Sequence, residues 1–183
     1  MSFLYLKPEA EGSLRQGEIL KGICEHRAIS TALDTKADIT FRTIRHELSV
    51  VISPDCDLYW DWAERQEEKS PAKLVSSIIL LDLVEKANIR DRIKNAKEWN
   101  AVKSKKLSRF HFLPSAAIKD EPSHAPLPEL LADFKGSFSV SPEALYSAAH
   151  QENTIRLCRI PDVYLHDLLQ RCFSFLARVS LPD

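Results

Sequence analysis

The tripeptide Asp55-Cys56-Asp57 places a thiol between two carboxylates, directly after an apolar run that ends at Pro54. Such a group could hold a metal ion or aim a thiolate nucleophile. A reactive thiolate, however, needs a cation or a helix N-terminus beside it, and flanking acids disfavour it. The pattern therefore favours a structural role, in which Cys56 is a small buried residue and Asp55 and Asp57 cap the turn and the start of a helix over residues 58–68.

Three other observations concern metals and cofactors. Cys24, His26, His46 and Cys56 are of the residue types that bind zinc, but their spacing is not that of a recurrent zinc finger, and the two histidines are expected at the surface. No pair of the four glycines forms a phosphate-cradling GxGxxG or GxxxxGK[ST] motif. The four cysteines are widely spaced and are expected to be reduced thiols. The sequence predicts no metal site and no cofactor.

Residues 86–109 are strongly basic. They hold nine lysines and arginines against Asp91 and Glu98, so this segment carries +7 and the rest of the chain −8, for a total of −1. Two acids are too few to neutralise the segment, which predicts a surface for nucleic acid or for an acidic protein partner. Trp99 is expected to stack on a base beside it. The candidate nucleic-acid-binding residues are Arg90, Lys94, Lys97, Lys103, Lys105 and Lys106.

The elements that position these residues are predicted from periodicity. Good helix formers, with apolar residues three and four apart, predict one helix over residues 85–104. Alternating apolar residues and β-branched runs predict an antiparallel sheet. Its strands are expected at residues 14–23, at 38–53 as two strands joined near His46, at 74–84, at 109–114 as an edge strand, and at 130–140 as one or two strands.

The C-terminal segment has the clearest helical pattern. Pro161 suits the first turn of a helix and Asp162 favours its positive end, which predicts a helix over about residues 161–178. One face of this amphipathic helix is expected to pack on the core. Its apolar residues are Leu165, Leu168, Leu169, Cys172, Phe173 and Leu176.

The composition is that of a globular protein. The 183 residues are 44% hydrophobic and 28% charged, which excludes global disorder. We expect a single domain over residues 1–183, of the α+β class, in which a strongly bent antiparallel sheet or small barrel occupies residues 14–140 and carries the C-terminal helix. The N-terminus lacks a signal-like apolar run, and no apolar stretch approaches the ~20 residues that span a bilayer. A cytoplasmic protein without membrane contact is expected, and the sequence leaves its oligomeric state open.

The stretches QGEIL at residues 16–20 and VVIS at 50–53 resemble the opening of the PemK/MazF-like barrels. Those proteins begin on a Gly-Asp/Glu-Ile strand and continue to a valine-rich strand that ends in serine. The resemblance covers roughly residues 14–60. It implies an SH3-like barrel, here elaborated by helices, and the toxins of that family are endoribonucleases.

The catalytic pattern of those toxins is not matched in this sequence. They place an arginine and a proline ahead of the valine strand, where this sequence has Glu47 and Leu48. Arg45, two residues before Glu47 on the same strand face, could substitute for the phosphate-binding arginine. Ser76 or Ser77 could stand for a second catalytic residue. The resemblance therefore implies the barrel fold for this chain but not the nuclease activity. Arg45 and Ser76 remain the catalytic candidates.

Three further stretches are similar to a group of prokaryotic proteins associated with mobile elements or phage defence. They are VVISPDCDL at 50–58, RFHFLP at 109–114 and LARVSLP at 176–182. This similarity implies no reaction. We expect a non-catalytic binding component of a defence or mobile-element system that contacts nucleic acid through the basic helix. The alternative is a toxin endoribonuclease, as in toxin–antitoxin pairs, acting through Arg45 and an unidentified base.

Overall fold

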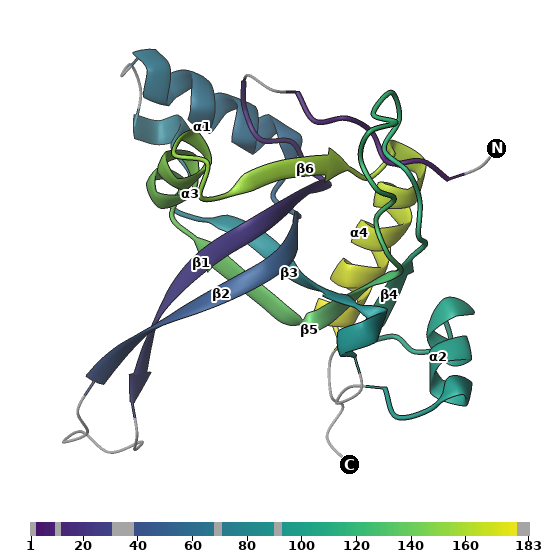
Figure 1. Cartoon of the computed structure of the whole chain (residues 1–183). Coiled ribbons are helices and arrows are strands. Elements are labelled where there is room, and N and C mark those ends of the chain that lie inside the picture. Colours follow the sequence, from purple (N-terminus) through teal and green to yellow (C-terminus); the bar gives the residue numbers. More distant parts are fainter. Residues whose placement is uncertain (1–2, 10–11, 31–38, 68–70, 90–92, 179–183) are drawn as a thin grey trace.

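A six-stranded antiparallel sheet forms the centre of the protein (Figure 1). The computed structural model describes residues 3–9, 12–30, 39–67, 71–89 and 93–178. The strands are β1 (Glu18–Ser30), β2 (Ile39–Val51), β3 (Ile78–Glu85), β4 (Phe110–Leu113), β5 (Leu130–Val140) and β6 (Ile155–Arg159), in the order β4-β5-β3-β2-β1-β6. The helices are α1 (Asp55–Glu67), α2 (Ala96–Lys103), α3 (Pro142–His150) and α4 (Asp162–Leu176), with the 3₁₀ turns η1 (Pro71–Lys73) and η2 (Lys86–Asn88). The predicted α+β class with an antiparallel sheet is confirmed.

Several predicted elements need correction. Residues 38–53 do not form two strands, because the ladder between β1 and β2 runs from Val50 to Ile39 without a register shift. The single helix over residues 85–104 is also wrong, because Asn95 caps a new helix and α2 starts only there. The first strand begins later than expected and reaches Ser30. The sequence patterns predicted neither α3 nor β6.

The pairing of β1 with β2 continues well past the rest of the sheet. β3 pairs with β2 only at residues 48–51, and β6 pairs with β1 only at residues 18–21. The remaining half of the hairpin therefore projects from the sheet as a two-stranded ribbon (Figure 1). Phe41, which is 79% exposed, lies on this ribbon.

The backbone of the N-terminal segment forms hydrogen bonds with edge strand β6 and with the residues that follow edge strand β4. Leu6 exchanges two backbone hydrogen bonds with Arg159 of edge strand β6, each 2.8 Å long. Tyr5 donates to the carbonyl of Ala117 and accepts from the backbone N–H of Lys119, in the chain that follows the other edge strand, β4. The segment therefore extends the pairing at one end of β6 and joins it to the chain that follows β4.

Alternate residues of the central strands enter two different cores. Ile19, Val50 and Leu81 belong to a cluster that α4 covers, whereas their neighbours Leu20, Val51 and Leu80 belong to a cluster that includes Leu58 of α1 and Leu145 of α3. This is the period of two that a strand buried on both faces requires. The sheet therefore has helices on both faces.

Helix α4 confirms the C-terminal prediction but buries a different stripe. Leu165, Leu168, Cys172 and Phe175 enter the core, at the spacing of three and four that one helix face gives. Phe173 and Leu176, which were expected there, are about half exposed: Phe173 lies beyond the edge of that face, and Leu176 is the last residue of the helix. None of the described helices is long and apolar enough to cross a membrane.

This packing predicts unequal effects for two matched substitutions on α4. Leu168 has no exposed surface, so Leu168→Asp buries a charge and removes a core side chain, and should lower the free energy of unfolding by more than about 3 kcal/mol. Phe173→Asp should change it by less than about 1 kcal/mol. Urea unfolding followed by circular dichroism measures both. Equal destabilisation by the two variants would contradict the assignment of the buried face.

Candidate functional site

Helix α2 begins at a well-formed cap. The side chain of Asn95 accepts the backbone N–H of Glu98 at 2.9 Å, and the carboxylate of Glu98 accepts the backbone N–H of Lys94 at 2.8 Å. This reciprocal arrangement satisfies two N–H groups that a helix start leaves without partners. One of the two acids of the basic segment is thus engaged with the backbone at the helix start.

The end of α2 positions two lysines. Lys105 takes the left-handed conformation, with φ of 60°, that glycine usually adopts after a helix. Its N–H donates to the carbonyl of Val102, and the N–H of Lys106 donates to that of Ala101. The chain therefore turns sharply, and the side chains of Lys105 and Lys106 leave it just beyond the helix.

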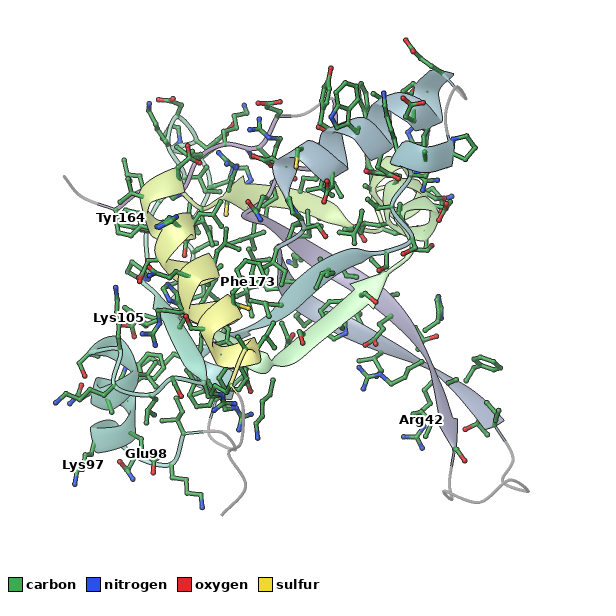
Figure 2. The ribbon with its side chains drawn as sticks, turned by 180° about the vertical axis from the view of Figure 1, so that it is seen from behind. Arg42, Lys97, Glu98, Lys105, Tyr164 and Phe173 are labelled. Atoms are coloured by element: carbon green, nitrogen blue, oxygen red, sulfur yellow. The ribbon has the colours of Figure 1, made fainter. Side chains whose placement is uncertain are left out.

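Five lysines in and around α2 are exposed, and we call them together the basic face: Lys94, Lys97, Lys103, Lys105 and Lys106. Lys105 pairs with Asp167 of α4 at 2.5 Å (Figure 2). For the other four lysines the described residues provide no ion pair. Arg90, also predicted for this surface, lies outside the described residues. Within the described part of the chain, four of the five lysines of the basic face thus have no acidic partner.

Two residues of the basic segment have roles that the sequence did not indicate. Trp99 was expected to stack on a base, but its side chain is only 8% exposed. It packs edge-on against Phe112 and lies in a cluster with Val102, so that it is unavailable for stacking. Arg109 forms a bidentate pair with the buried Asp133, at 2.7 and 2.5 Å. This arginine is therefore held at β5 rather than on the basic face.

Asp55 is the first residue of α1 and fastens that helix to the chain before β1. Its carboxylate accepts the backbone N–H of Gln16 at 2.6 Å and two N–H groups of Arg15. Partial burial opposes ionisation, but these bonds and the charges of Arg15 and Arg159 outweigh it and lower the pKa of Asp55. The carboxylate thus has a structural role, but not the predicted one of capping a helix over residues 58–68, because α1 begins at Asp55 itself and Asp55 binds Arg15 and Gln16 instead.

The prediction for Cys56 is wrong. Cys56 is exposed, because residues 55–57 form the first turn of α1 and its side chain lies on the solvent side. Its Sγ lies 3.5 Å from Oδ1 of Asp57, to which the thiol can donate. Within the described residues no group of three His, Cys, Asp or Glu side chains could hold a metal ion.

The two catalytic candidates are not joined by any contact of the described residues. Arg45 is exposed on β2, where its Nε lies 3.7 Å from the carboxylate of Glu47 and its guanidinium lies beside Gly22. Ser76 is exposed in the chain between η1 and β3. A nuclease of the toxin type needs both groups at one phosphate.

A cluster of charged and aromatic side chains surrounds His46, and the sequence patterns did not predict it. Nε2 of His46 lies 3.1 Å from Glu25 of β1, and Nδ1 lies 3.4 Å from Asp82 of β3. The imidazole stacks on Phe138 of β5, with ring centroids 3.7 Å apart, and Arg27 binds the carboxylate of Glu25. The cluster lies in a cleft of about 820 Å³. His46 was expected at the surface, and only the pairing of four strands brings these groups together.

The chemistry of His46 follows from its two acidic neighbours. Burial of the ring opposes protonation, but the hydrogen bonds and charges of Asp82 and Glu25 outweigh it and raise the pKa of His46. An imidazole with a carboxylate at each nitrogen is suited to hold strands together rather than to take a proton from a substrate. We therefore assign this cluster a structural role.

The comparisons with known proteins add no family to this description. No protein-family model matches the chain, and no curated protein matches it.

The His46 cluster predicts a pH dependence of stability. A raised pKa in the folded state stabilises the protein below the ordinary histidine value of about 6.5, and this contribution is lost as the pH rises through the folded-state pKa. The free energy of unfolding should therefore fall over the pH range above about 6.5 in the parent protein. The fall should be smaller in His46→Gln and unchanged in His26→Gln, an exposed control. Urea titrations across that range measure it, and identical slopes in parent and His46→Gln would refute the assignment.

Proposed function

We propose that this protein is a non-catalytic binding component that contacts nucleic acid through the basic face. The observation that carries the proposal is the set of exposed lysines for which the described residues provide no ion pair. Lysines placed in this way can neutralise phosphates, and the release of condensed counterions then drives association. The total charge of −1 does not oppose this, since the cations are gathered locally.

The length and the buried side chains of α2 favour contact with the phosphate backbone of a nucleic acid rather than with its bases. The helix has eight residues, and its two largest apolar side chains, Trp99 and Val102, face the core. The lysines around it are flexible point charges, which contact phosphates without reading sequence. We therefore expect binding to depend weakly on sequence.

The proposal includes the fold family and the setting. We propose an SH3-like barrel elaborated by helices, similar to the PemK/MazF-like proteins, acting in the cytoplasm as part of a prokaryotic defence or mobile-element system. In support, the N-terminal segment bonds to β6 on one side and to residues 117–119, beyond β4, on the other. The two ends of the open sheet are thus connected through that segment.

The endoribonuclease alternative lacks a comparable observation. Arg45 and Ser76 share no contact in the described part of the chain, and Glu47 lies beside the guanidinium of Arg45. A carboxylate at that place would repel the negative charge that the phosphate carries in the transition state of cleavage. Binding without cleavage is the better supported reading.

Charge reversal on the basic face tests the proposal. The triple variant Lys97→Glu/Lys103→Glu/Lys106→Glu should lose most of its affinity for single-stranded RNA at low salt. The matched control Lys21→Glu/Lys119→Glu/Lys135→Glu has the same total charge, also uses exposed lysines, and should retain it. In the parent, the slope of log affinity against log salt should be roughly −0.7 per phosphate contact, because counterion release makes binding weaker as salt rises. Fluorescence anisotropy measures these quantities.

The same preparations decide between the alternatives. Equal losses in both triple variants would contradict the basic face as the binding surface, and no binding by the parent would point instead to an acidic protein partner. Discrete RNA cuts that disappear in Arg45→Ala would establish the nuclease, and we expect none on a denaturing gel.

A further inference from the structure

A small pocket adjoins the basic face, where the chain after α2 meets the C-terminal half of α4. Its volume is about 390 Å³. Figure 2 shows Lys105 between α2 and α4, and the ion pair of Lys105 with Asp167 joins the two helices near this pocket. The pocket is lined by Ser108, Gln170, Arg171, Ser174, Phe175 and Arg178.

Arg171 is held in a fixed orientation. Its terminal nitrogens donate to the carbonyls of Lys105 at 3.4 Å, of Leu107 at 3.1 Å and of Phe110 at 3.0 Å. Its Nε is buried and has no hydrogen-bond partner. The guanidinium therefore ties the chain that follows the basic face to α4 and brings a permanent positive charge to the pocket.

Arg178 is oriented in a second way. Its guanidinium stacks on the ring of Phe175, 3.6 Å from the centroid, and its Nε donates to the Phe175 carbonyl at 2.9 Å. The two terminal nitrogens of Arg178 have no bond within the described residues. They remain available as a fork of donors, the geometry that matches an oxyanion.

The rest of the lining is polar and uncharged. Ser108, Ser174 and Gln170 supply two hydroxyls and one amide, and the described residues provide no hydrogen bond to these side chains. The lining of the pocket within the described chain includes no acid. The negative end of the α4 dipole opposes an anion here, and the charge of Asp167 on the same helix is balanced by Lys105. The buried neighbour His111 has a pKa lowered, chiefly by burial, to about 4, so it is neutral at pH 7.

We propose that this pocket binds one phosphate group of a polynucleotide backbone, with Arg178 and the two serine hydroxyls as donors and Arg171 as a fixed positive charge beside them. The inference rests on the proposed function and extends it, because it adds a defined phosphate subsite to a diffuse surface of lysines. The pocket is linked to the basic face by a hydrogen bond, since Arg171 of the pocket donates to the backbone carbonyl of Lys105. A phosphodiester of a bound strand and a free phosphate present the same oxygens to these donors.

The test uses three variants of the full chain and two probes. Arg178→Gln removes the charged fork, and Ser174→Ala removes one hydroxyl. Arg42→Gln is the matched control, since it removes an exposed arginine from the hairpin ribbon, far from α4 in Figure 2. The probes are inorganic phosphate and a short oligothymidylate without terminal phosphate, each measured by isothermal titration calorimetry at low salt.

We expect Arg178→Gln to weaken oligothymidylate binding about tenfold or more, since a charged hydrogen bond is lost, and Ser174→Ala to weaken it about fivefold. Arg42→Gln should bind as the parent does. Loss of oligothymidylate affinity with little binding of phosphate alone would identify a backbone subsite. Equal loss for both probes would identify a site that also accepts free phosphate.

Two results would overturn the inference or separate it from the proposed function. Unchanged affinity for both probes in Arg178→Gln and Ser174→Ala would refute the subsite, even where the lysine variants confirm the basic face. Conversely, phosphate binding that depends on Arg178 in a protein whose RNA affinity ignores the basic-face lysines would keep the subsite and refute the proposed function.

Discussion

The antiparallel pairing of β1 with β2 is the constraint on which the rest of the structure depends. Its unbroken register fixes which residues face each core, places Glu25 beside His46, and sets Gly22 beside Arg45. A slip by one residue would move every apolar side chain of these strands to the opposite face. β3 and β6 then add to the two sides of this hairpin near its base, and the helices cover the resulting sheet.

The charged residues divide into two groups with different roles. Arginines make fixed, bidentate pairs inside the fold: Arg156 with the fully buried Glu18, Arg109 with Asp133, and Arg15 with Asp55. Lysines dominate the basic face. The planar guanidinium suits buried carboxylates, whereas the flexible ammonium group suits solvent and phosphate.

The proposed binding surface and the phosphate pocket depend on the packing of α2 against the rest of the protein. Trp99 and Val102 anchor the helix, the capping bonds of Asn95 and Glu98 fix its start, and the left-handed Lys105 fixes its end. Arg171 then ties the following chain to α4. A rigid base of this kind lets flexible lysines present charge without disturbing the fold.

Local sequence determined the charge of residues 86–109, strand β4 ending before Pro114, and a C-terminal helix that packs through Leu165, Leu168 and Cys172. Each depends on residue type and on periodicity over a few positions, which sequence displays directly. Tertiary structure decided that Trp99 is buried, that Cys56 is exposed, and that His46 lies between Glu25 and Asp82. Groups that are distant in the chain meet only when strands pair and helices pack, and no local propensity encodes that choice.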